Sequence, residues 1–239
     1  MPLPKIAAPT YELELPSTGE TIEYRPFLVK EEKLLIIALE SEDMKQITNG
    51  IKNVLRNCIL TSGIKVQDLP TFDIEYLFLN IRGKSVGESI EVNLLCPDDG
   101  ETEVKAKIWL DDIKVKKYDD HNDKIKIDDT IMVQMKYPSL DQFIKSNFDF
   151  SKKTSMDQTF ELVASCIGTI FTEEEAWSSS DCTKKEMVEF LESMNSSQFK
   201  EIEKFFETMP KLSHEIKLTN PNTKVESDIL LEGLASFFA

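Results

Sequence analysis

Histidine, glycine and long hydrophobic runs are all scarce in this chain of 239 residues. Only two histidines and eight glycines are present, and the glycines form none of the clustered loops that hold nucleotide phosphates. No apolar run approaches the roughly 18 residues of a membrane-spanning helix. The first residues lack the apolar core and cleavage site of a signal peptide. The sequence therefore predicts a cytosolic protein with no membrane contact.

Basic residues are also few, because 28 Lys and Arg stand against 43 Asp and Glu, for a net charge of −15. Phosphate binding needs clustered cations, so nucleic acid is not expected as a partner. The acidic charge either aids solubility or complements a basic protein partner. The four cysteines have no paired spacing, which predicts reduced thiols and no disulfide; they are Cys58, Cys96, Cys166 and Cys182.

A repeated segment is the most informative feature that the sequence does contain. Residues 89–97 (SIEVNLLCP) match residues 213–221 (SHEIKLTNP), and a fainter copy of the turn lies at residues 16–21. Each copy alternates apolar and polar residues around a turn with Pro and Gly, Asn or Asp, which is typical of a β-hairpin. We align the return arms by matching Val104, Ile108 and Leu110 with Val225, Ile229 and Leu231.

The sequence predicts an α+β fold in which repeated β-hairpins pack with helices, and a helical C-terminal half closes on a final hairpin. The hairpins are expected at residues 11–27, 89–110 and 213–231, the last two alike and each followed by a helical turn. Helical periodicity predicts further elements at 30–39, 43–58, 72–82, 140–146 and in three stretches after 155. Gly83 is the expected stop of the third helix. A polar stretch suggests two domains, 1–147 and 148–239.

Few residues suggest catalysis or metal binding. His121 lies in an acidic loop with no second histidine or cysteine pair nearby, so we interpret it as a solvated loop residue. The turn at 96–100 resembles one arm of a zinc knuckle, but Asp99 stands where the second cysteine belongs. The acidic run at 172–177 has no calcium-loop spacing. The sequence therefore predicts no catalytic residue, no metal and no cofactor.

One enzymatic alternative remains open, a metal-dependent hydrolase that uses Asp111, Asp112, His121 and Glu173. These residues occupy predicted loops without the spacing of metal ligands, which argues against it.

The C-terminus carries an apolar cluster, and it is the only candidate binding site in the sequence. Its members are Leu230, Leu231, Leu234, Phe237 and Phe238. The cluster either packs on the chain's own core, as large apolar residues usually do, or docks into a partner protein.

Several longer segments resemble a known family. Residues 15–19 (LPSTG), 24–35 (YRPFLVKEEKLL), 68–88 and 209–238 are similar to the T4-like bacteriophage (myovirus) baseplate proteins, and the resemblance covers most of the chain. It implies a baseplate hub subunit or hub assembly protein that binds other hub proteins in the host cytoplasm while the baseplate is built. The family brings no catalytic residues. The sequence leaves open the oligomeric state and whether the protein stays in the virion's tail baseplate.

Overall fold

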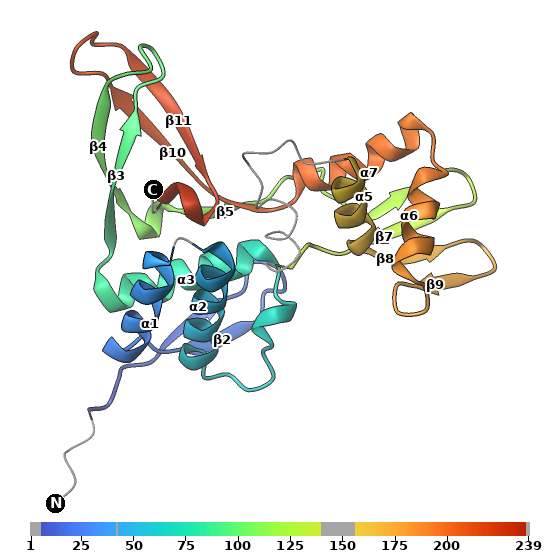
Figure 1. Ribbon diagram of the computed structural model, residues 1–239, viewed down its shortest axis with the longest axis horizontal. Coiled ribbons are helices and arrows are strands. Elements are labelled where there is room, and N and C mark those ends of the chain that lie inside the picture. The colour runs from blue at the N-terminus through green and yellow to red at the C-terminus, as the bar shows by residue number, and fades with distance from the viewer. Residues whose placement is uncertain (1–5, 42, 140–155, 238–239) are drawn as a thin grey trace, which may run out of the picture. The chain divides into compact units, whose positions relative to one another are not determined.

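The computed structural model describes residues 6–41, 43–139 and 156–237, and the fold is the predicted mixture of helices and small β-sheets (Figure 1). The chain divides into two compact units. Unit 1 contains residues 1–66, 72–116 and 211–239, and unit 2 contains residues 67–71 and 117–210. The domain boundary expected near residue 147 and the helix expected at 140–146 lie outside the described residues.

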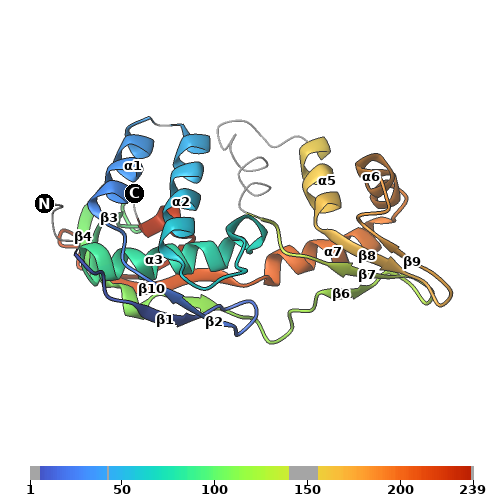
Figure 2. The ribbon, with the colours of Figure 1, turned by 90° about the horizontal axis from the view of Figure 1, so that it is seen from below.

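Three helices form the base of unit 1, α1 (Val29–Glu40), α2 (Met44–Cys58) and α3 (Thr71–Val86), and a short 3-10 turn (Val66–Asp68) precedes α3. Asp43 caps α2 by accepting a hydrogen bond from the Lys45 backbone N–H. Most apolar side chains of α3 are buried, as its sequence predicts. Figure 2 shows α1 and α2 standing next to each other in this unit. None of the described helices is long and apolar enough to cross a membrane.

Gly83 does not end α3, contrary to the sequence-based prediction, because the helix continues to Val86. A Cβ atom at Gly83 would lie only 3.0 Å from Leu110 Cδ1, so glycine lets the helix pack closely against the residues after the second hairpin. Gly87, with φ of 150°, is the residue that follows the helix end.

The three predicted hairpins are confirmed, and all belong to unit 1. The first joins β1 (Tyr11–Glu14) to β2 (Thr21–Tyr24), the second β3 (Ser89–Leu95) to β4 (Glu103–Trp109), and the third β10 (Lys211–Thr219) to β11 (Glu226–Glu232). Short helical turns follow the last two, η2 (Leu110–Asp112) and η3 (Leu234–Phe237). Strand β5 (Lys114–Lys116) pairs with the outer edge of β10.

The three hairpins share one turn geometry. In each, a residue with positive φ donates its N–H to the carbonyl four residues earlier, and a proline follows that carbonyl. The donors are Gly19, Gly100 and Lys224, with φ of 73°, 67° and 65°, and the acceptors are Leu15, Cys96 and Asn220. Two of the turns place glycine where the left-handed conformation favours it, and the third places lysine there.

The predicted alignment of the return arms is wrong by two residues. Ile108 pairs with Ile90, and Leu231 pairs with His214, the counterpart of Ile90, so Ile108 corresponds to Leu231 rather than to Ile229. The third turn is one residue shorter than the second, and the sequence comparison allowed a gap that was too long. Side chains on a strand alternate with a period of two, so a two-residue slip leaves the apolar pattern intact and escapes notice.

Replacing Lys224 with glycine should stabilise the folded chain. A non-glycine residue in the left-handed region costs about 1–2 kcal/mol, part of which is offset by the greater freedom of glycine in the unfolded chain. Lys224→Gly should therefore raise the free energy of unfolding by about 0.5–1 kcal/mol in urea titrations. Gly100→Ala is the matched control and should lower the free energy of unfolding. If both variants changed stability in the same direction, the two turns would not share one geometry.

The second and third hairpins project together from the helices of unit 1 (Figure 1) and enclose one buried apolar cluster of its core. Ile90, Val92 and Ile108 of the second hairpin belong to the same buried cluster as Leu218 and Leu231 of the third. At the tips, the Asn220 side-chain amide donates to both carboxylate oxygens of Asp98, at 3.0 and 3.1 Å, and to Asp99 at 2.8 Å. The hairpins are therefore joined along their inner faces and at their ends.

The described part of unit 2 contains a four-stranded antiparallel sheet and three helices. The strands run in the order β6 (Lys124–Lys126), β7 (Met132–Met135), β8 (Ile167–Phe171) and β9 (Ala176–Ser178). The helices are α5 (Met156–Ser165), α6 (Lys184–Glu192) and α7 (Ser196–Thr208), with α5 and α6 on one side of the sheet (Figure 2). Thr183 and Glu186, at the Thr-x-x-Glu spacing of a capping box, form one at the start of α6.

Candidate interaction surfaces

His121 is partly buried and held by side chains of unit 2 rather than solvated, which corrects the sequence-based interpretation. Its Nδ1 lies 3.0 Å from Thr208 Oγ1, and its Nε2 lies 2.9 Å from Tyr137 Oη. The imidazole stacks on the Tyr137 ring and lies 5.1 Å from the Phe205 ring centroid. Because both ring nitrogens are engaged by hydroxyl groups, this arrangement suits a structural role and not a metal ligand.

Unit 2 should lose stability in mildly acidic solution because of His121. Burial lowers the pKa of His121 below its ordinary 6.5, although the carboxylates of Asp123 and Asp120 act in the opposite direction. The unfolded chain then binds more protons than the folded chain, so stability is full above about pH 6.5 and falls as the pH drops below it.

This effect can be measured in a Trp109→Phe background, where Trp177 of unit 2 is the one tryptophan left in the chain. Urea titrations of its fluorescence at pH 7.5 and 5.5 should give a lower unfolding free energy at pH 5.5. The added change His121→Gln should flatten that dependence. A slope that persists in His121→Gln would assign the effect to other groups.

The residues of the hydrolase alternative are divided between the two units. Asp111 and Asp112 lie in η2 of unit 1, whereas His121 and Glu173 belong to unit 2. Among the described residues, no group of three or more His, Cys, Asp or Glu side chains is placed to hold a metal ion. The four cysteine thiols are free.

The knuckle-like turn at residues 96–100 is a joint between hairpins. Cys96 is buried, and burial raises the pKa of its thiol. Hydrogen bonds from Thr102 and Glu101 hold the pKa of Asp99 well below its usual range, and hydrogen bonds from Thr223 and Asn220 lower that of Asp98. Both carboxylates are thus occupied by neighbouring donors, so the turn fixes the hairpin tips together.

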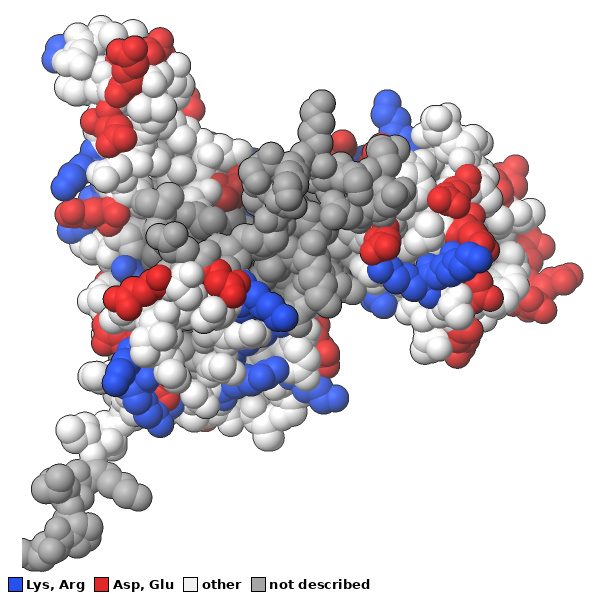
Figure 3. Space-filling model, in the orientation of Figure 1, with Lys and Arg blue, Asp and Glu red and all other residues white. Residues whose placement is uncertain are grey.

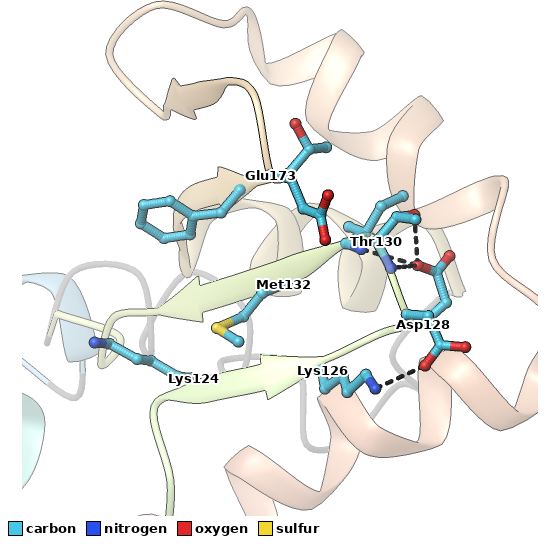
Figure 4. Close-up of a pocket in the computed structure, with 10 residues that line it drawn as sticks. Lys124, Lys126, Asp128, Thr130, Met132 and Glu173 are labelled. Carbon is cyan, nitrogen blue, oxygen red and sulfur yellow. Dashed lines mark hydrogen bonds and ion pairs between the residues drawn. The ribbon is translucent and has the colours of Figure 1, made fainter.

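Unit 2 has a surface hollow of about 380 Å³ beside β6, β7 and the end of β8 (Figure 4). Its polar rim is internally bonded, because Asp128 Oδ1 accepts hydrogen bonds from Thr130 N, Thr130 Oγ1 and Ile131 N. Lys126 forms an ion pair of 2.8 Å with Asp129. A second hollow, of about 310 Å³, has an almost wholly apolar lining that includes Trp177, Met187 and Phe190.

A family model described as "T4 bacteriophage base plate protein" matches residues 8–239, nearly the whole chain. The chain belongs to this family. The resemblance that the sequence suggested is therefore confirmed. No curated protein and no solved structure matched the chain. The partners of a baseplate protein are other proteins of the phage tail baseplate.

The C-terminal cluster of this baseplate protein is split between its own core and its surface. Leu231 is buried, and Phe237 is only 1% exposed, both in the core between the hairpins. Leu230 is 47% exposed. Leu234 lies in η3, and Phe238 lies outside the described residues. Of the expected binding residues, Leu230 is the one that the described structure offers to a partner.

Two exposed apolar surfaces of the baseplate protein were missed by the sequence analysis. Trp109, at the end of β4, is 52% exposed, and Lys107 Nζ lies 4.5 Å from its ring centroid. Helix α1 exposes several aliphatic side chains, namely Val29, Leu34, Ile36 and Ile37. The α1 surface could have been suspected, because the run 34–39 is apolar over more than one helical turn and leaves no wholly polar face.

Proposed function

We propose that this baseplate protein is a non-enzymatic assembly protein of the baseplate hub, which binds other hub proteins in the host cytoplasm while the baseplate is built. The observation that carries the proposal is a large exposed apolar residue on the outward face of each of the second and third hairpins. Trp109 on the second hairpin and Leu230 on the third are each about half exposed. Large apolar residues at such positions are typical anchors of protein–protein contacts, tryptophan above all.

The contacts that hold the second and third hairpins together support this role. The shared core and the Asp98–Asn220 joint hold both hairpins in one arrangement before any partner arrives. A rigid surface loses less conformational entropy on binding, so its contacts contribute more of their energy to affinity. Chemistry at this surface has no support, since the carboxylates at the tips are already occupied by neighbouring donors.

A pull-down from infected cells tests the binding surface. The double variant Trp109→Ser/Leu230→Ser should lose the hub proteins that co-purify with the wild-type chain. Trp177→Ser in unit 2, which also removes a partly exposed tryptophan, is the matched control and should retain them. Retention by the double variant would refute the outward faces of the two hairpins as docking sites.

Quantitative mass spectrometry separates an assembly protein from a structural subunit. We expect the chain in baseplate precursors and not at stoichiometric amounts in purified phage. A fixed copy number in the mature virion would replace the assembly role by the alternative, a stoichiometric subunit of the baseplate hub.

A further inference from the structure

Helix α1 turns four aliphatic side chains outward and buries a carboxylate on its inward side, where Ala38 is also buried. Val29 is 79% exposed and Ile37 is 51% exposed, with Leu34 and Ile36 exposed to a similar degree as Ile37. On the opposite side Glu31 is fully buried. This reverses the usual pattern of a surface helix, in which the apolar stripe faces the core. The outward face is therefore a surface whose composition suits burial.

The exposed face also has an ordered charge pattern. A spacing of seven residues returns to nearly the same side of a helix, so Val29 lies in one row with Ile36, and Lys33 lies in one row with Glu40. Lys30 and Lys33 stand near the N-terminal end, and Glu40 is the last residue. In Figure 3, over α1, basic side chains gather toward the lower end and acidic ones toward the upper end, with uncharged surface between them.

Lys30 forms an ion pair with Glu31 of the same helix at 3.4 Å, but Lys33 and Glu40 do not serve the helix itself. The helix dipole favours acidic groups at the N-terminus and basic groups at the C-terminus. The exposed charges Lys33 and Glu40 run against that rule, and the last turn has no basic residue. Their arrangement does fit another helix of the same kind placed antiparallel, since each end would then meet the opposite charge and the two dipoles would oppose each other.

We propose that α1 pairs antiparallel with α1 of a second copy of this chain, around a two-fold axis between Ile36 and Ile37. The axis brings Ile36 of each copy opposite Ile37 of the other, and Lys33 opposite Glu40 of the second copy. Such an interface is self-complementary, as a two-fold interface must be. Both ion pairs form at once because the two-fold axis generates each from the other.

The α1 face is also a place where two copies can approach despite a net charge of −15 on each. Its exposed charges, Lys30, Lys33 and Glu40, sum to +1, whereas contact through the acidic remainder would be repulsive. Four aliphatic side chains bury less than the roughly 800 Å² per partner of a standard interface. The dimer is therefore expected to dissociate on dilution.

Charge exchange tests this pairing in the full chain by sedimentation equilibrium over a range of concentrations. Wild type should form a dimer. Lys33→Glu alone and Glu40→Lys alone should each weaken the dimer on the order of tenfold, since two attractive pairs become repulsive. An equimolar mixture of the two variants should dimerise like wild type, because both pairs of the mixed dimer again join an acidic side chain to a basic one. Both native side chains are exposed, so the fold is retained, as unchanged circular dichroism should verify.

A second pair of variants tests the apolar centre of the proposed interface. Each variant adds one lysine, so the change in net charge is the same for both. Ile37→Lys should abolish the dimer, whereas Leu95→Lys, at an equally exposed aliphatic residue of β3, should leave it intact. A wild-type chain that stays monomeric at every concentration overturns the proposal. So does a mixture that fails to restore the dimer. Loss of a different baseplate protein from Ile37→Lys, with a monomeric wild type, would assign the face to that protein instead.

Discussion

Replacing Phe237 with alanine should lower the free energy of unfolding by about 3–5 kcal/mol, the cost of emptying a well-packed aromatic site. Phe237 is 1% exposed and packs in the core between the second and third hairpins, with Ile108, Leu231 and their neighbours. Its removal leaves a cavity that backbone strands on both sides cannot readily fill. Thermal unfolding of unit 1 should then occur about 10 °C lower.

Leu230→Ala provides the control for Phe237→Ala. It removes a similar apolar side chain from the neighbouring strand, but from the exposed side, and should cost under about 1 kcal/mol. The two variants thus separate the two roles expected for the C-terminal cluster. A small effect of Phe237→Ala would show that the tail does not hold the hairpins together.

Replacing Glu31 with alanine should cost about 3 kcal/mol of unfolding free energy, because it leaves the part-buried Arg25 guanidinium without its carboxylate partner. Glu31 Oε1 accepts from Arg25 Nη2 at 3.1 Å, and Oε2 accepts from the Leu28 N–H at 2.8 Å. The first contact joins the end of β2 to α1, and the second closes the first turn of α1. Denaturant titration measures the loss, and Glu32→Ala, one residue further along, should change stability by less than about 0.5 kcal/mol.

The Arg25–Glu31 ion pair should make the stability of the fold depend on pH in acidic solution. Burial acts to raise the pKa of Glu31, but the hydrogen bonds from Arg25 and the Leu28 N–H outweigh it, and the pKa is lowered overall. The folded chain then binds fewer protons than the unfolded chain, so this stabilisation is complete above the ordinary carboxyl pKa and is lost as the pH falls below about 4. The double change Arg25→Met/Glu31→Leu should be milder than Glu31→Ala, since it leaves no buried charge unpaired.

The hairpins could be predicted because the residues that determine each one are close together in the sequence. Alternating strands and a turn with proline and glycine stand next to each other in the sequence, and the repeat supplies them three times. Helices α2 and α3 and the Thr183 capping box are local in the same sense. The strands β8 and β9 were missed because Ile167–Phe171 follows α5 directly, and a short apolar run does not distinguish a strand from a buried helix by periodicity.

The candidate surfaces could not be predicted because exposure is a property of tertiary packing. The sequence marks Trp109 and Ile37 as apolar, and only the folded structure leaves them at the surface. The same holds for His121, whose partner Thr208 lies 87 residues away, and for Asn220, which reaches Asp98 across 122 residues. Such contacts depend on how elements pack, which local periodicity does not encode.

The discontinuity of unit 1 has a consequence for biosynthesis. Residues 1–116 contain most of this unit, yet β10, β11 and Phe237, which cover the inner face of the second hairpin, are made last. At the usual 5–20 residues per second, a ribosome needs roughly 5–20 s to translate residues 117–210 in between. During this interval the nascent second hairpin exposes an uncovered apolar face to solvent, where chaperones and proteases can bind it. Chains that terminate before β10, β11 and Phe237 cannot complete unit 1. A folded unit 1 therefore requires translation through residue 237.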